Sequence, residues 1–89
     1  MTNRVLHQHL PEDGSWLQFV VPAKEMRSLD LGEFEDRSLL PKLEFDYDEN
    51  NVSHTDSPDT MSDGSIRLMI HFQNFGVEAE TVRVRERAA

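Results

Sequence analysis

Every second residue is apolar in several segments of this chain, and this alternation limits what the chain can fold into. The clearest case is SIRLMIHF, residues 65–72, where more polar side chains separate Ile66, Leu68, Ile70 and Phe72. Successive side chains of a β-strand point to opposite faces, so a period of two predicts a strand with one buried face. The chain is therefore expected to be built mainly from strands.

Two further segments predict strands with one buried and one wet face. In KLEFDYDE, residues 42–49, the inward row is expected to be Leu43, Phe45 and Tyr47, opposite a row of acids. In TVRVRER, residues 81–87, Val82 and Val84 point inward and the arginines point outward. Outward charges guard exposed sheet edges, so the last strand is expected at an edge.

The N-terminal part predicts two more strands. Residues 4–10, RVLHQHL, read as a strand, with a short helix as the alternative. Residues 15–21, SWLQFVV, are apolar on both faces and predict a central strand. Pro22 ends that strand because proline has no backbone N–H to donate to a ladder.

The connections between these segments carry their own signals. Residues 23–31, AKEMRSLDL, predict one or two helical turns that end at Gly32. QNFG, residues 73–76, predicts a tight hairpin between the last two strands, because Asn and Gly tolerate positive φ. Residues 48–65 are rich in Ser, Thr, Asn, Asp, Pro and Gly, and predict a flexible acidic loop inserted between two strands.

These elements together predict an all-β or β-dominated α+β fold in one small domain, residues 1–89. About five antiparallel strands would be joined by one short helix and the long acidic loop. A small sheet, a partial barrel and a sandwich all agree with the pattern. A chain of 89 residues builds only a thin core, which leaves association into a homodimer open.

The acidic residues are unevenly distributed along the chain. Residues 30–63 carry a net charge of −9, whereas the whole chain carries −8. Such a field repels phosphates, which argues against direct binding of nucleic acid. It favours instead a protein partner with a basic surface, which electrostatic attraction would steer toward the acidic segment.

The expected function is therefore that of a small non-enzymatic interaction module, such as an accessory subunit, a regulator or an inhibitor. Its acids would contact the partner, and the arginines of the last strand would contribute at the expected edge. The candidate partner-binding residues are Glu44, Asp46, Asp48, Glu49, Asp56, Asp59, Asp63, Arg83 and Arg85.

A sharper version of this hypothesis is an inhibitor that imitates nucleic acid. Glu44, Asp46 and Asp48 would lie about 6.6–6.8 Å apart in succession on one strand face. That is about twice the axial phosphate spacing of one DNA strand. A row of this kind could occupy the basic groove of a nucleic-acid-binding protein.

Histidines suggest an alternative of another class, a metal-binding module. His7 and His9 are two residues apart, so on a strand they would project from one face, as two ligands of one metal must. His71, on another predicted strand, would be the third ligand. No cofactor is otherwise implied.

Several classes of function find no support. The chain has no Cys, which excludes disulfides, thiolate metal sites and a cysteine nucleophile. It also has no nucleophile elbow, phosphate loop or Walker lysine, so an enzyme is not expected. The longest apolar run, residues 19–23, is far shorter than a membrane span, and the N-terminus does not resemble a signal peptide. A cytoplasmic protein is expected.

Overall fold

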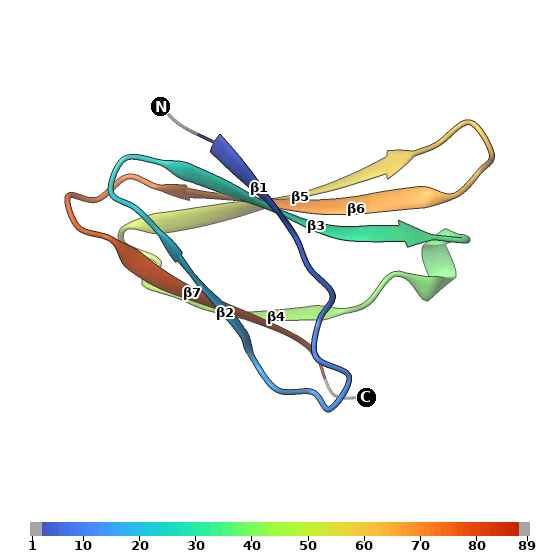
Figure 1. The fold of residues 1–89 in the computed structure, drawn as a ribbon, viewed down its shortest axis with the longest axis horizontal. Coiled ribbons are helices and arrows are strands. Elements are labelled where there is room, and N and C mark those ends of the chain that lie inside the picture. The colour runs from blue at the N-terminus through green and yellow to red at the C-terminus, as the bar shows by residue number, and fades with distance from the viewer. Residues whose placement is uncertain (1–2, 88–89) are drawn as a thin grey trace.

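Seven strands form two sheets that pack face to face. The computed structural model describes residues 3–87 (Figure 1). A short 3-10 helix, η1 (Arg37–Leu39), lies between the third and fourth strands. The strands are β1 (Asn3–His7), β2 (Leu17–Val21), β3 (Met26–Phe34), β4 (Leu43–Asp46), β5 (Val52–Thr60), β6 (Ile66–Asn74) and β7 (Glu80–Glu86).

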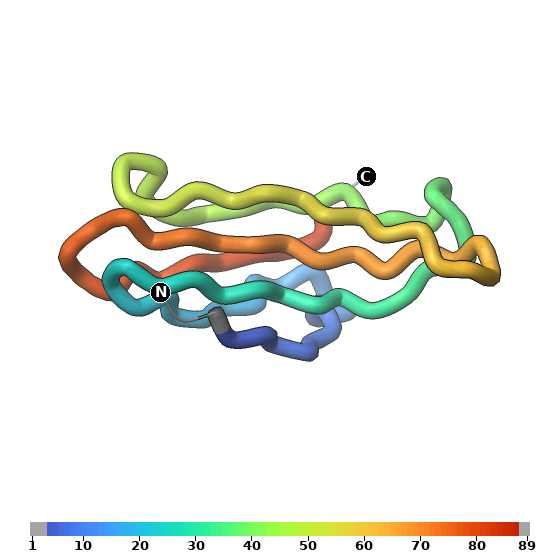
Figure 2. The backbone as a smooth tube through the Cα atoms, turned by 90° about the horizontal axis from the view of Figure 1, so that it is seen from above, coloured from blue at the N-terminus to red at the C-terminus, as the bar shows by residue number. Residues whose placement is uncertain are grey.

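The strand order is β1-β3-β6-β5 in one sheet and β2-β7-β4 in the other. Apart from β1, which runs parallel to β3, all paired strands are antiparallel. Among the described residues only the β5–β6 hairpin joins consecutive strands of one sheet, and every other connection crosses between the sheets. Viewed from above, β4 and β5 run along one side of the sandwich (Figure 2).

The core lies between the inner faces of the two sheets. Phe72 of β6 is fully buried at its centre, with its ring 5.2 Å from Phe19 of β2 and 5.9 Å from Phe45 of β4. Offset aromatic contacts of this kind add to the free energy gained by burial. The buried apolar cluster consists of Val21, Leu29, Leu31, Val52, Leu68, Ile70, Phe72, Val82 and Val84.

A buried amide ties the two sheets together at one end. The Nδ2 group of Asn74, at the end of β6, donates to the carbonyl oxygens of Val21 (3.0 Å) and Glu78 (2.8 Å). Its Oδ1 accepts from the amide of Gly76 at 2.8 Å. All of these groups would be costly to bury unpaired, so Asn74 fixes the β6–β7 connection against β2.

The structure confirms the β-dominated fold and the faces of three strands. Buried and half-buried residues alternate strictly along β6, Val82 and Val84 of β7 are fully buried, and the inner residues of β4 pack against the core. The N-terminal strand is also present as β1. Within residues 3–87, no helix has the length and apolar character needed to cross a bilayer.

The helix predicted for residues 23–31 is wrong, because this region contains most of β3. Ser28, Leu29, Asp30 and Leu31 are all buried, since β3 lies between β1 and β6 and is covered on both faces. Burial on both faces removes the alternation that reveals a strand. Gly32 (φ 93°) does not end a helix and lies instead at an irregularity in the β3–β6 register.

The predicted order of strands is also wrong in three places. β2 is an edge strand, not a central one, and β7 lies in the centre of its sheet between β2 and β4. Residues 73–76 do not form a hairpin, because β6 and β7 belong to different sheets. Residues 3–87 contain seven strands where about five were expected, because β3 and β5 were not predicted as strands.

The acidic loop expected over residues 48–65 is not confirmed, since β5 occupies half of this segment. β5 is an edge strand, and all but three of its nine residues are exposed to solvent. Its composition resembles a loop because so little of it faces the core. Pro58 is tolerated because an edge strand has a side that needs no hydrogen-bonding partner.

Candidate functional site

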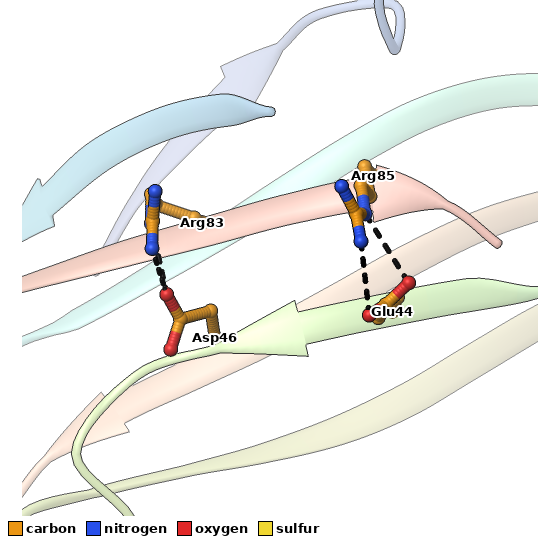
Figure 3. A network of polar contacts seen from close by, with 4 residues as sticks. All are labelled: Glu44, Asp46, Arg83 and Arg85. Carbon is orange, nitrogen blue, oxygen red and sulfur yellow. Dashed lines mark hydrogen bonds and ion pairs between the residues drawn. The ribbon is translucent and has the colours of Figure 1, made fainter. Parts of the chain in front are cut away.

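Four of the predicted partner-binding residues lie together on the outer face of the three-stranded sheet. The register places Arg85 of β7 opposite Glu44 of β4, and Arg83 opposite Asp46. Arg85 donates to both carboxylate oxygens of Glu44, each at 3.2 Å, and Arg83 donates to Oδ2 of Asp46 through Nε (2.9 Å) and Nη2 (Figure 3). These four residues form a salt-bridge ladder.

An aromatic side chain covers the arginines of this ladder. Trp16, just before β2, lies with its ring centre 4.1 Å from the guanidinium carbon of Arg85 and 5.1 Å from that of Arg83. Cations over an indole face are attracted by its quadrupole. Each arginine is thus held between the indole that precedes β2 and a carboxylate on β4.

The ladder neutralises itself. Hydrogen bonds from Arg85 are the main reason that the pKa of Glu44 is lowered, and the charges of Arg85 and Arg87 act in the same direction. The ladder side chains are about 36–49% exposed, so solvent screens these pairs. The negative charges of Glu44 and Asp46 are each balanced by the guanidinium beside them.

The other five predicted acids lie along the side of the sandwich formed by β4, β5 and the turns that flank β5. We call this the β4–β5 side, residues 43–63. None of the ion pairs found within residues 3–87 joins one of these five carboxylates to Lys or Arg. They are Asp48, Glu49, Asp56, Asp59 and Asp63.

Two of these five carboxylates also shape the turns in which they lie. Asp48 accepts from the amide of Asn50 at 2.9 Å, and Asp63 accepts from the amide of Ser65 at 2.9 Å and from its hydroxyl at 2.6 Å. Hydrogen bonds from the Ser65 side chain and then its backbone lower the pKa of Asp63. Both acids are fixed in direction, which reduces the entropy that a contact with a partner would cost.

An aromatic contact that the sequence did not predict joins the edge strands of the two sheets. The imidazole of His54, on β5, stacks on Phe45 of β4 with ring centres 4.0 Å apart. Its Nδ1 lies 2.6 Å from the hydroxyl of Tyr47, which follows β4. Burial, and then the charge of Glu49, raise the pKa of Tyr47. In the sequence, Tyr47 and His54 are only seven residues apart. This separation indicates a contact only if residues 47–51 form a tight turn, as they do in the structure.

Two adjoining cavities open along this seam. One has a volume of about 320 Å³ and is bordered by Tyr47, Glu49 and His54. The other, of about 250 Å³, lies toward η1 and the β5–β6 hairpin. Leu43 and Phe45 line both cavities, so the two adjoin and together mark a groove between the edges of β4 and β5.

The three histidines predicted as metal ligands do not form one cluster. Nδ1 of His7 lies 3.1 Å from Asp30, whereas Nδ1 of His71 lies 2.7 Å from the hydroxyl of Ser28. His9 lies beyond the end of β1. In the part of the chain that the structure describes, no three His, Cys, Asp or Glu side chains are grouped as metal ligands would be. The arrangement therefore gives the metal hypothesis no support.

The carboxylate of Asp30, which lies near His7, is buried. Its Oδ1 accepts from the amide of Gly32 at 2.9 Å, and Nε of Arg67 lies 3.4 Å from its Oδ2. Nε of Arg67 makes no hydrogen bond within residues 3–87, so this contact is an ion pair only. Asp30 is thereby used within the fold and is not available to a partner.

Comparisons with protein-family models, with curated proteins and with solved structures each found no match to this chain.

Proposed function

We propose that this protein is a small non-enzymatic interaction module that docks its β4–β5 side on a basic surface of a protein partner. It would act as an accessory subunit, a regulator or an inhibitor. One observation carries this proposal. The acids on β4 are paired with arginines of the same chain, whereas the five acids around β5 are left without Lys or Arg partners on one side of the sandwich.

Electrostatics would act mainly on the rate and specificity of this docking. Complementary charge raises association rates and rejects partners of like charge, whereas rim charges contribute little to affinity individually. Salt screens charges over about 8–10 Å at physiological ionic strength. Binding is therefore expected to weaken as salt is added, mainly through slower association.

The test compares two triple variants with the same net charge. In the first, Glu49→Gln, Asp56→Asn and Asp59→Asn remove three of the five acids. In the control, three exposed acids outside the β4–β5 side are neutralised as Glu12→Gln, Glu35→Gln and Glu78→Gln. The partner is captured from a lysate of the native host at low and high salt and is quantified by mass spectrometry.

The wild type and the control are expected to retain the same partner, and the first variant is expected to lose it. Retention of the partner by all three proteins would refute the proposed role of the β4–β5 side. The matched charge separates this role from a general effect of acidity. Circular dichroism of both variants checks that they are folded.

The nucleic-acid mimic remains a special case, in which the partner's basic surface is a nucleic-acid groove. The row that would imitate phosphates consists of Glu44, Asp46 and Asp48, and Glu44 and Asp46 lie in ion pairs with Arg85 and Arg83. The pairing weakens this version. Competition between DNA and the protein for the captured partner distinguishes it from docking elsewhere.

A further inference from the structure

The groove between β4 and β5 has features that the charge alone does not explain. We call it the seam groove: residues 43–47 form one wall, and His54, Asp56 and Pro58 form the other. Leu68 and Ile70 of β6 line it at the η1 end. The groove thus mixes apolar side chains, mainly at the η1 end, with carboxylates, mainly at the Glu49 end, and this mixture fits a segment that carries both apolar and basic side chains.

One wall of the groove is a free sheet edge. The amide of Arg87 donates to the carbonyl oxygen of Lys42 at 2.7 Å, so residues 42 and 87 are a hydrogen-bonded pair of the antiparallel β4–β7 ladder. Such pairs alternate along a ladder. The N–H and C=O groups of Leu43 and Phe45 therefore point away from β7, toward the edge on which no further strand of residues 3–87 lies.

The edges of the sandwich are not equally protected. β5 carries Pro58 and two aspartates, which discourage pairing with another strand. The outward acids of β4 lie in ion pairs with β7, so they do not repel an incoming strand as free charges would. Of the two edges that bound the seam groove, β4 is therefore the one suited to accept a strand.

Charge decides what kind of strand would fit. Lys42 and Arg87 lie where β4 begins, whereas Asp48 and Glu49 lie just after it ends, and Asp56 lies on the opposite wall. With Asp59 and Asp63 farther along, the five carboxylates outnumber these two cations and Arg67, which lies opposite Asp59 in the β5–β6 register. A second copy of this chain would bring a second acidic β5 edge against the first, which disfavours it as the occupant.

We infer that the seam groove binds an extended segment of the partner as an additional strand on β4. Apolar side chains of that segment would face Leu43 and Phe45, and a basic side chain would lie over the Glu49 end. Such binding is β-augmentation, in which main-chain hydrogen bonds give affinity and side-chain pockets give specificity. This inference rests on the proposed function and names the partner's contacting element.

The experiment uses the full chain, labelled with ¹⁵N, and a capped heptapeptide of alternating valine and lysine as the probe. Addition of the peptide is expected to shift amide resonances of residues 43–49 and to slow hydrogen exchange at Leu43 and Phe45. Simple charge attraction would not protect these two amides. A peptide with glutamate in place of lysine is expected not to bind.

Two double variants then test whether the acids Glu49 and Asp56 contact the basic side chain of the peptide. Glu49→Gln with Asp56→Asn is expected to weaken peptide binding by about three- to tenfold, as for two rim charges. Glu35→Gln with Glu78→Gln carries the same charge and is expected to bind like the wild type. Equal binding by both double variants would contradict the placement of the basic side chain.

Two results would overturn strand addition. One is peptide binding that leaves exchange at Leu43 and Phe45 unchanged. The other is sedimentation of the free protein as a dimer with both amides already protected, which would assign the edge to a second copy. If the native partner is captured through the acids while the peptide fails to protect these amides, only this inference fails and the proposed function stands.

Discussion

Arg85 donates from Nε and Nη2 to the two carboxylate oxygens of Glu44, each at 3.2 Å, across the antiparallel β4–β7 pair. A fork of this kind matches the planar guanidinium to the planar carboxylate. Because the pair is internal, the outer face of the three-stranded sheet is close to neutral. Of the seven acids predicted to bind a partner, the other five lie along the neighbouring β4–β5 side, where no ion pair found within residues 3–87 joins them to Lys or Arg.

The first prediction concerns the indole that covers the ladder. Replacement of Trp16 by Leu keeps an apolar side chain but removes the attraction between the ring and the two guanidinium groups. The free energy of unfolding is expected to fall by about 0.5–1 kcal/mol, the size of an exposed cation–π contact. Urea unfolding followed by circular dichroism measures it, and an unchanged midpoint would show that the stacking has no energetic role.

The second prediction concerns acid pH. Arg85 lowers the pKa of Glu44 in the folded state. The stabilisation from this pair is therefore present above the unfolded pKa of about 4.5 and is lost as the pH falls through the lower, folded value. Wild type and Glu44→Gln should differ in urea midpoint at pH 7 and converge near pH 2. A difference that persists there would mean that the ionised carboxylate is not its source.

The third prediction uses Tyr47, the only tyrosine in the chain. Its pKa is raised above 10.0 by burial and by Glu49, so absorbance at tyrosinate wavelengths should titrate with a midpoint above 10. The unfolded state loses this proton first, so the contribution to stability is intact below pH 10 and declines as the pH rises further. Glu49→Gln should lower the midpoint, and Glu35→Gln should not. A wild-type midpoint at or below 10 would contradict the burial of the hydroxyl.

The fourth prediction concerns the amide that ties the sheets together. Asn74→Ala removes three hydrogen bonds from a fully buried position and leaves the Val21 and Glu78 carbonyls without this donor. Unfolding free energy should fall by about 1–3 kcal/mol or more. Asn50→Ala, in an exposed turn, serves as the control and should change it by less than about 0.5 kcal/mol. Similar losses in both variants would argue against a special role for Asn74.

The alternation in the sequence predicted those strands that have one face on the core and one face in water. Residues 66–74 are the clearest example, because β6 is central and its outer face is lined by half-buried polar side chains. β3 was missed because both of its faces are buried around Ser28–Leu31, and β5 because most of its residues are wet. Alternation of apolar and polar residues appears only where one face of a strand is buried and the other is exposed. A strand buried on both faces, or exposed over most of its residues, does not show it.

The sequence singled out Glu44, Asp46, Arg83 and Arg85 as candidate residues, but it did not predict that they form ion pairs with one another. Glu44 and Arg85 are 41 residues apart, and nothing local in the sequence indicates that β4 and β7 are neighbours. The arginine row looked like a protected edge, whereas its charges are balanced by the strand beside it. The same long-range pairing separates Glu44 and Asp46 from the five other acids predicted to bind a partner.

A map of electrostatic potential over the surface tests most directly whether the charges of Glu44 and Asp46 are balanced while those of the acids in residues 48–63 are not. Two nitroxides of equal size, one cationic and one anionic, are added separately to ¹⁵N-labelled protein, and the relaxation of each amide proton is compared. Amides of residues 48–63 are expected to relax faster with the cationic nitroxide, whereas those beside Glu44 and Asp46 should respond almost equally to both. An equal response over residues 48–63, or a strong preference for the cation beside Glu44 and Asp46, would contradict the separation of paired from unpaired acids.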